Sequence, residues 1–227
     1  MDYGSELQRI KSMVSGCTKI MALDLETWIT KGFLKNERII AVSIATIDGY
    51  TEIFTGDYGH DDQIELIGKL SAVMDEYKPE VIIGYNHTSY DIPLMNTNTV
   101  KMAFGDKFWP MKYYLGTSYV LDMMYVCALH GATLSGEYRI RSLKKVVNAP
   151  EYSHLNLLRS KDEIDIPGMS KGDAIVWAWK NARDSFLRYC RGDVQDLIEL
   201  YRHILCDFIH HVDNKYFLLK KVPISPR

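Results

Sequence analysis

Apolar and polar positions along this chain follow two periods, and these periods predict its secondary structure. Residues 19–27 form an apolar run, and residues 38–48 and 51–56 follow it with the character of strands. The Asp-Gly pair between the last two is typical of a hairpin turn. Residues 61–77 place apolar side chains at helical spacing. The pattern therefore predicts three strands before the first long helix of the core.

After one more strand, the rest of the chain is predicted to be mainly helical. Residues 80–86 read as a short strand buried on both faces, because their apolar residues are continuous rather than alternating. We expect helices at about 5–15, from about 91, 119–130, 141–148, 171–180 and 183–212. Residues 105–118 and 149–169 are expected to be loops. This order predicts a single α/β domain over residues 1–227 with a mixed sheet, its core at about 19–212.

Composition and charge narrow the functional classes. The chain has 227 residues, and its composition, 47% hydrophobic and 25% charged, is that of an ordinary globular protein. Its net charge is -2. The chain therefore has no global basic field for nucleic acid, although metal ions at an acidic site can supply positive charge. The four cysteines are scattered, which disfavours a disulfide framework or a zinc site. We see neither a secretory signal nor an apolar run of about 20 residues, and expect a soluble cytoplasmic protein without membrane contact.

Two acidic residues lie in the first predicted strand. Asp24 and Glu26 are two positions apart, so their side chains point to the same face. A carboxylate in a buried strand is costly unless a partner neutralises it, and a divalent metal is the usual solution. A D-x-E pair alone is more often the solvated end of a strand. Here it follows an apolar stretch rather than an alternating one, which favours the buried site.

Further acids lie in two other segments. Asp91 follows the predicted strand at 80–86, where α/β folds often place ligand sites, and it is equally suited to cap a helix. Tyr189 and Asp193 are four apart on a strongly helical stretch and therefore share one face. Asp193 borders the apolar stripe, whereas Asp196 and Glu199 are expected to be exposed partners of the nearby Arg202 and Arg191. Three separated segments that offer acids to one point suggest a two-metal hydrolase site.

Three motifs, in order, resemble those of the DEDD exonucleases, the DnaQ-like branch of the ribonuclease H-like superfamily. The first motif, D-x-E-T, reads Asp24-Leu25-Glu26-Thr27. The second, Gly-Tyr-Asn followed by an aromatic-Asp pair, runs from Gly84 to Tyr90-Asp91 and is similar to that of family B DNA polymerase proofreading domains. Tyr90 stands where Phe is more usual. The third, Y-x-x-x-D, runs from Tyr189 to Asp193.

The resemblance extends to the branch of the family and to the fold. Position 188, where histidine-type members carry their base, holds Arg188, so the chain resembles the tyrosine-type branch. The similarity covers most of residues 19–212. It implies a ribonuclease H-like fold, a mixed β-sheet flanked by α-helices.

The resemblance also implies a cofactor and catalytic roles. Two Mg²⁺ or Mn²⁺ ions about 3.5–4 Å apart would stabilise the attacking and leaving oxygens of a phosphodiester. Asp24, Glu26 and Asp193 would hold the ion that activates water. Asp24 would also touch a second ion, with Asp91 acting on it directly or through water. Tyr189, protonated because its ordinary pKa is about 10, would orient the nucleophilic water.

Contacts to the substrate are expected from the first two motifs, at Leu25, Thr27, Trp28, Asn86 and Tyr90. Trp28 or Tyr90 could stack on a base, a contact worth about 1–3 kcal/mol, and packing is the alternative for both rings. The Asn86 amide could contact substrate or hold its loop.

The resemblance implies a 3′–5′ exonuclease acting on single-stranded nucleic acid, and the second motif favours DNA over RNA. An RNase D-like exoribonuclease is one alternative, because it shares the tyrosine motif. A non-catalytic nucleic-acid-binding or scaffold domain is another, although such domains usually lose a metal-binding acid. The sequence identifies no protein partner.

Overall fold

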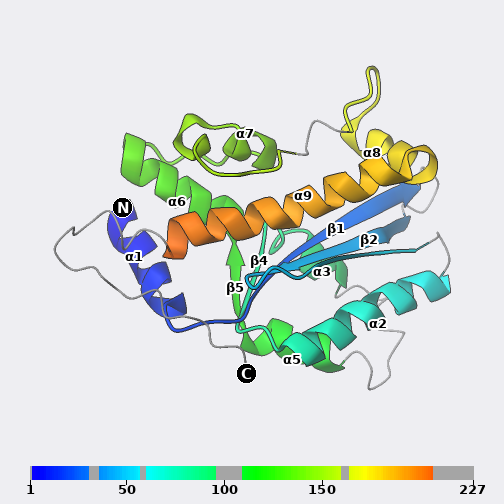
Figure 1. The fold of residues 1–227 in the computed structure, drawn as a ribbon, viewed down its shortest axis with the longest axis horizontal. Coiled ribbons are helices and arrows are strands. Elements are labelled where there is room, and N and C mark those ends of the chain that lie inside the picture. The colour runs from blue at the N-terminus through cyan, green and yellow to red at the C-terminus, as the bar shows by residue number, and fades with distance from the viewer. Residues whose placement is uncertain (1, 31–35, 57–59, 96–108, 160–163, 207–227) are drawn as a thin grey trace.

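The computed structural model describes residues 2–30, 36–56, 60–95, 109–159 and 164–206. In this part of the chain a five-stranded sheet lies between helices on both of its faces (Figure 1). The strands are β1 (Ile20–Thr30), β2 (Asn36–Thr46), β3 (Thr51–Thr55), β4 (Val81–Gly84) and β5 (Tyr119–Asp122). The helices are α1 (Tyr3–Val14), α2 (His60–Tyr77), α3 (Asp91–Met95), α5 (Trp109–Thr117), α6 (Met123–Ser135), α7 (Leu143–Val147), α8 (Lys171–Asn181) and α9 (Arg183–Tyr201). A 3₁₀ turn (Pro150–Tyr152) and a π-helical turn (Arg202–Cys206) complete the elements. The predicted α/β class is confirmed.

The sheet is mixed, with the strand order β3-β2-β1-β4-β5. Strands β1, β2 and β3 form an antiparallel meander, while β4 and β5 run parallel to β1. The meander turns through a tight loop in which Gly49 has a φ of 100°, a conformation that glycine adopts at little cost. Because β1 and β4 are parallel, their carboxyl ends point to the same edge of the sheet. The sheet therefore brings the acids of β1 and the loop after β4 to one region.

Strand β1 sorts its side chains between the two faces of the sheet. Met21, Leu23 and Leu25 are buried in the apolar cluster that includes α2 and α5. Ile20 and Ala22 are buried in the cluster that includes α9. Each large apolar side chain buried in this way contributes roughly 1.5–3 kcal/mol to folding. Because side chains alternate along a strand, the acids at positions 24 and 26 fall on the α9 face.

The structure corrects two of the predicted elements. Residues 119–122 form strand β5 rather than the start of a helix, since they pair with β4 and the helix begins only at Met123. The apolar residues continue across this junction without a break, which hid it from the sequence pattern. Residues 109–117 form α5 rather than a loop. Pro110 does not prevent this helix, because it lies in the first turn, where proline is tolerated.

The predicted helix at 183–212 is confirmed as α9 up to Tyr201 and then becomes the π-helical turn. Residues 207–212 lie outside the described part of the chain, as do residues 105–108 of the predicted loop. Among the described residues, no helix is both long enough and apolar enough to cross a membrane.

Candidate active site

Three carboxylates meet where α9 crosses β1. One oxygen each from Asp24, Glu26 and Asp193 lies within 4.8 Å of the other two. Glu26 is 8% exposed and Asp193 1%, while Asp24 is partly exposed. Negative charges held this close repel one another, and burial raises the cost. A divalent cation relieves that cost, and an all-oxygen donor set suits Mg²⁺ or Mn²⁺. The residues therefore fit the metal centre that the sequence predicts.

Tyr189 lies one helical turn before Asp193 and is fully buried. Burial raises the pKa of its hydroxyl well above 10, and the charges of Glu26, Asp193 and Asp24 raise it further. The hydroxyl therefore stays protonated at neutral pH and can only donate its proton in a hydrogen bond to a negative partner. The Nζ of Lys171, at the start of α8, lies 5.3 Å from the centroid of the Tyr189 ring.

Cys190 is a further residue on which the charges of the acidic cluster act, and the sequence did not predict this. Its thiol is fully buried, and burial, followed by the charges of Glu26, Asp24 and Asp193, raises its pKa well above the ordinary value. The thiol therefore stays neutral, and it packs in the apolar cluster that α9 forms with α8 and β2. Nothing in the spacing of the four cysteines marks this position, because its environment arises only when α9 packs on β1.

Asp91 opens α3 and is 3% exposed. It lies outside the group of three mutually close carboxylates. Its segment is tied down by the backbone, since the Ile92 N–H donates to the His87 carbonyl oxygen over 2.9 Å. Asn86, predicted to contact substrate or hold this loop, has a φ of 61° and donates its backbone N–H to Asp122 over 2.8 Å.

The remaining predicted substrate residues occupy distinct settings. Leu25 is 5% exposed and its side chain lies in the cluster on the α2 side, away from the acids. The Thr27 and Tyr90 hydroxyl oxygens are 2.8 Å apart. Trp28 packs against α8: the Nζ of Lys180 lies 3.8 Å from its ring centroid, and the Trp179 ring lies 5.9 Å away. A base that stacks on Trp28 would compete with Lys180 on the face that this lysine covers.

The prediction that Asp196 is an exposed partner of arginines is wrong. It is 2% exposed, and its carboxylate accepts hydrogen bonds from the N–H groups of Leu158 (2.6 Å) and Arg159 (3.1 Å). Its position one turn beyond Asp193 places it over the segment that precedes α8, which its carboxylate anchors. Glu199 does pair with Arg202, as expected.

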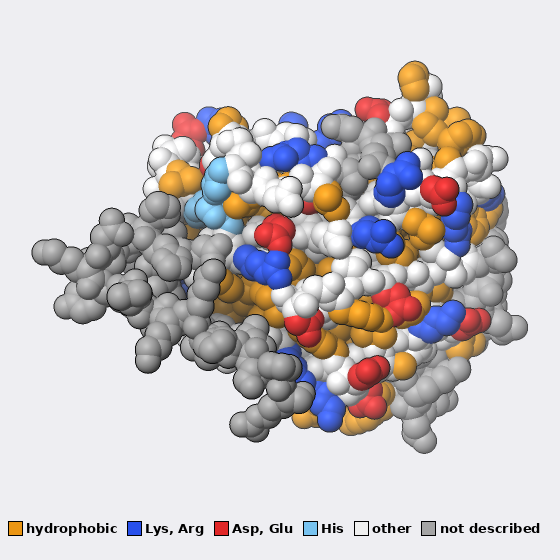
Figure 2. Space-filling model, viewed as in Figure 1, with side chains coloured by type: hydrophobic (Ala, Val, Ile, Leu, Met, Phe, Trp, Pro, Cys, Tyr) orange, Lys and Arg blue, Asp and Glu red, His pale blue; other side chains and the backbone are white. Residues whose placement is uncertain are grey.

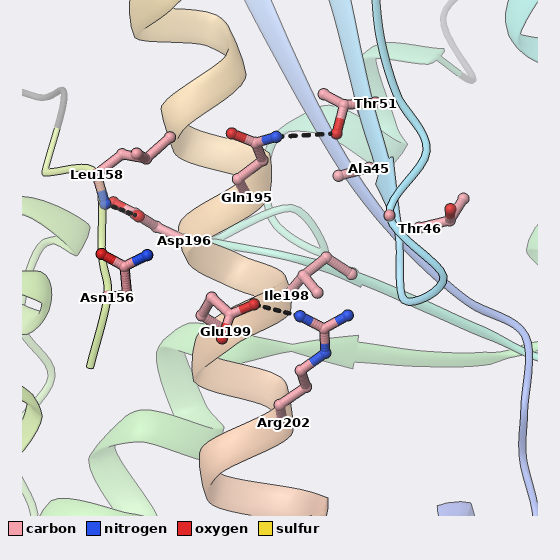
Figure 3. A pocket seen from close by; sticks show the side chains of 11 residues that line it. Ala45, Thr46, Thr51, Asn156, Leu158, Gln195, Asp196, Ile198, Glu199 and Arg202 are labelled. Carbon is pink, nitrogen blue, oxygen red and sulfur yellow. Dashed lines mark hydrogen bonds and ion pairs between the residues drawn. The ribbon is translucent and has the colours of Figure 1, made fainter. Parts of the chain in front are cut away.

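A cavity of about 270 Å³ lies beside Asp196 rather than at the carboxylate cluster. Side chains from α9, the β2–β3 hairpin and residues 156–158 line it, and Gln195 bonds Thr51 across it over 3.1 Å (Figure 3). This cavity contains none of the predicted site residues.

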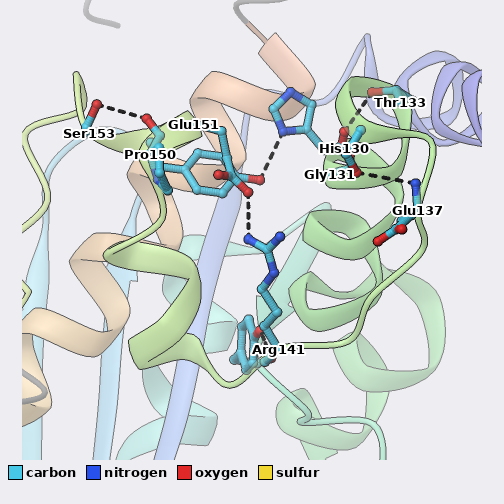
Figure 4. Close-up of polar contacts among 11 residues, drawn as sticks. His130, Gly131, Thr133, Glu137, Arg141, Pro150, Glu151 and Ser153 are labelled. Atoms are coloured by element: carbon cyan, nitrogen blue, oxygen red, sulfur yellow. Dashed lines mark hydrogen bonds and ion pairs between the residues drawn. The ribbon is translucent and has the colours of Figure 1, made fainter.

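The basic segment of residues 139–145 carries cations that have acidic partners. Arg141 bonds Glu151 over 2.7 Å (Figure 4), Lys144 lies 3.9 Å from Asp165, and Arg139 pairs with Glu137. On the face shown in Figure 2, basic and acidic side chains are interspersed. Arg139, Arg141 and Lys144, which lie before and on α7, are thus paired within the protein, and this favours a solvated surface over a binding track for phosphates.

Comparison with known proteins supports the same type of site as the geometry does. Residues 4–102 match the family model described as DNA polymerase family B, exonuclease domain, a range that contains Asp24, Glu26 and Asp91. The predicted resemblance to the family B exonuclease domain is confirmed. No curated protein sequence matches the chain significantly.

A solved structure extends the similarity to the second half of the chain. The fold is similar to that of the family B DNA polymerase from the hyperthermophilic archaeon Pyrobaculum calidifontis, with a TM-score of 0.56, 18% sequence identity and 82% of this chain covered. The chain spans 24% of that polymerase. The α/β architecture with a mixed sheet that the motifs predict therefore agrees with the fold of part of that polymerase.

Sequence reasoning missed Asp122. This residue ends β5 and caps α6, and its carboxylate also bonds the loop that carries Asn86 and Thr88. An aspartate between a Tyr-Val-Leu run and a helix is a recognisable strand-to-cap signal. It was overlooked because residues 119–130 were interpreted as one helix.

Proposed function

We propose that this chain is a metal-dependent 3′–5′ exonuclease that removes nucleotides from single-stranded DNA by two-metal-ion phosphodiester hydrolysis. The observation that carries the proposal is the approach of Asp24, Glu26 and Asp193 to within 4.8 Å of one another beside a protonated tyrosine. The similarity to the family B exonuclease domain supports the same chemistry. The chain would act as one exonuclease domain.

Each residue of the cluster has a role in this proposal. Asp24, Glu26 and Asp193 would hold the metal, with Asp91 contributing to a second ion. Two Mg²⁺ or Mn²⁺ ions, when bound, supply a lowered pKa for the attacking water and stabilise the charge on the attacking and leaving oxygens. Tyr189 would donate its hydroxyl hydrogen bond to the attacking water oxygen and thereby orient it.

The reaction balances without a further reactant. The water oxygen forms a bond to the phosphorus of the terminal phosphodiester, and the bond from phosphorus to the 3′ oxygen of the preceding nucleotide breaks. That oxygen takes up a proton and becomes the new 3′-hydroxyl of the shortened strand. A nucleoside 5′-monophosphate leaves the site.

The residues beside the acids, together with the family match, support single-stranded DNA as the substrate. Thr27 and Tyr90 lie next to Glu26 and Asp91 in sequence, so the residues expected to contact the terminal nucleotide flank the acids. A ring such as that of Tyr90, which is 38% exposed, offers a surface for an unpaired base. The match to a DNA polymerase domain favours DNA over RNA.

The test is a degradation ladder on 5′-labelled single strands of DNA and RNA with matched sequence, in Mn²⁺, Mg²⁺ or EDTA. Asp24→Ala controls for contaminating nucleases. We expect labelled products that shorten one nucleotide at a time on DNA, only with metal and only with the wild-type protein.

Other outcomes assign other functions. Faster degradation of RNA would replace the DNA assignment with an exoribonuclease of the RNase D type. Intact strands under every condition, together with tight binding of single-stranded DNA, would contradict hydrolysis and favour a binding or scaffold domain.

A further inference from the structure

Asp122 connects the end of one strand to the loop that leaves its neighbour. It pairs in register with Gly84 across the parallel strands β4 and β5 and is 7% exposed. Its Oδ1 accepts from the N–H of Asn86 (2.8 Å) and of Met124 (3.1 Å). Its Oδ2 accepts from the hydroxyl of Thr88 (2.7 Å) and the N–H of Thr88 (3.3 Å). Hydrogen bonds to an ionised acceptor are stronger than neutral ones, so this carboxylate restrains the loop firmly.

Capping α6 explains only part of this arrangement. The bond from Met124 is the ordinary N-cap contact, and a serine or asparagine side chain would make it equally well. The other three bonds all go to residues 86–88, which belong to the loop after β4 rather than to the capped helix. The carboxylate therefore has a second task that its role as a helix cap does not require.

The same loop is restrained at two further points. The His87 ring lies directly over Gly84, where a Cβ atom would come within 2.4 Å of the ring nitrogen Nδ1. His87 is fully buried, and its carbonyl oxygen accepts the Ile92 N–H over 2.9 Å. The chain between Gly84 and Asp91 thus follows a path fixed by a close contact, a carboxylate and a backbone hydrogen bond. Of these three restraints the carboxylate is the one that comes from another strand, and at the end of the loop the Tyr90 hydroxyl also contacts Glu37 and Thr27.

We propose that Asp122 is a positioning residue that holds the turn at Asn86–Thr88 so that Asp91 is presented to the second metal. The inference rests on the proposed function for the role of Asp91. Asp122 itself touches neither the metal nor the substrate. It acts through the loop, as outer-shell partners do when they fix the orientation of a metal ligand.

Two variants separate this role from helix capping. Asp122→Ser keeps a good N-cap for α6, but its shorter side chain cannot bridge the cap and the loop together. Thr88→Val removes the hydroxyl donor from the loop while preserving its shape. Val126→Ala, in the buried face of α6, is the matched control because it lowers stability and leaves every bond of Asp122 in place.

The primary measurement is calorimetric titration of Mn²⁺ into the wild-type protein and the three variants, without nucleic acid. We expect two sites in the wild type. Asp122→Ser should weaken the second site by about 10- to 100-fold and leave the first unchanged, since losing an outer-shell partner has an effect of this size. Thr88→Val should produce a smaller loss in the same site, and Val126→Ala should leave both sites unchanged.

Hydrogen exchange at the Ile92 amide provides the second readout. Exchange should accelerate in Asp122→Ser and Thr88→Val but not in Val126→Ala. Faster exchange with unaltered Mn²⁺ affinity would assign Asp122 a merely structural role and overturn the proposal, as would unchanged exchange in the folded variants.

The two proposals fail in distinguishable ways. A wild-type protein that binds two Mn²⁺ ions but never cleaves DNA refutes the exonuclease, and the effect of Asp122→Ser on the second site still decides the role of Asp122. A wild-type protein that binds one Mn²⁺ ion or none overturns the positioning role directly.

Discussion

The hydroxyl oxygens of Thr27 and Tyr90 lie 2.8 Å apart, the first on the strand that carries Glu26 and the second just before the helix that begins with Asp91. The carboxylate of Glu37, from β2, accepts from both hydroxyls, over 2.9 Å in the case of Thr27. Two segments that are far apart in sequence and carry proposed metal ligands are thereby connected beside the acids. Tyr90 makes this connection through the one atom that Phe, the more usual residue of the motif, would lack.

Tyr90 is predicted to act mainly through its ring. Tyr90→Phe keeps a stacking surface and should change the affinity for single-stranded DNA less than about threefold, because partly exposed hydrogen bonds contribute little. Tyr90→Ala should weaken binding by about 1–3 kcal/mol, the range for one base stacked on an aromatic ring. Fluorescence anisotropy with Ca²⁺ in place of Mn²⁺ measures both. Equal losses in the two variants would assign the role to the hydroxyl network instead.

Asp193 is predicted to be essential for turnover and for stabilisation by metal. Asp193→Asn removes one charge of the cluster and should reduce the hydrolysis rate by on the order of 10³-fold or more, since metal interactions with the reacting oxygens are worth several kcal/mol. Mn²⁺ should raise the Tm of the wild-type protein and raise that of the variant far less.

Asp184→Asn is the matched control for this prediction. The residue lies in the first turn of the same helix and is exposed, so both properties should stay as in the wild type. Thermal melts with and without Mn²⁺, alongside the degradation ladder, give the comparison. A normal rate in Asp193→Asn would exclude it from the metal centre.

Tyr189→Phe is predicted to slow hydrolysis without lowering the affinity for the metal. Because the pKa of Tyr189 is raised above 10, its hydroxyl does not titrate between pH 6 and 9. The variant should therefore lose about 10- to 100-fold in rate at every pH in this range and keep the shape of the profile. Rate against pH, with Mn²⁺ affinity measured in parallel, is the test. A pH break that disappears in the variant would show that the tyrosine acts as a base.

Asp196 is predicted to make stability depend on pH. Burial is the main cause that raises its pKa from 3.8 to about 6, against the lowering effect of the Leu158 and Arg159 N–H groups. Between these values the folded protein binds a proton that the unfolded chain does not. The stability due to this group therefore falls as pH rises from about 4 to about 6 and is constant above that.

Asp196→Asn removes this titration. The free energy of unfolding of the wild type relative to the variant should decrease by on the order of 1–3 kcal/mol between pH 4.5 and pH 7. Urea denaturation at the two pH values measures it. A difference that does not change with pH would contradict the raised pKa.

Most strands and helices could be predicted from the sequence, because the spacing of apolar residues along the chain differs between a strand and a helix. The alternation that buries Met21, Leu23 and Leu25 on one face also placed Asp24 and Glu26 on the other. The four-residue interval between Tyr189 and Asp193 placed both on the buried side of α9. These are properties of a single strand and a single helix, so the sequence contains them.

Contacts between segments that are distant in sequence could not be predicted from these patterns. Strand β5 exists because β4 offers it a parallel partner, and its short apolar run cannot be told from the helix that follows. Asp196 was interpreted as exposed because its hydrogen-bond donors come from residues 158 and 159, in a segment without regular structure. Asp122 and Glu37 likewise act on residues more than 30 positions away, so their roles appear only once the chain is folded.

The most direct test of the central claim is anomalous diffraction at the manganese edge from crystals grown with Mn²⁺. The account predicts anomalous density bounded by the carboxylates of Asp24, Glu26 and Asp193, and its loss in crystals of Asp24→Ala. Density confined to other acidic residues, or an unoccupied cluster at saturating Mn²⁺, would contradict the assignment of these three carboxylates as a metal centre.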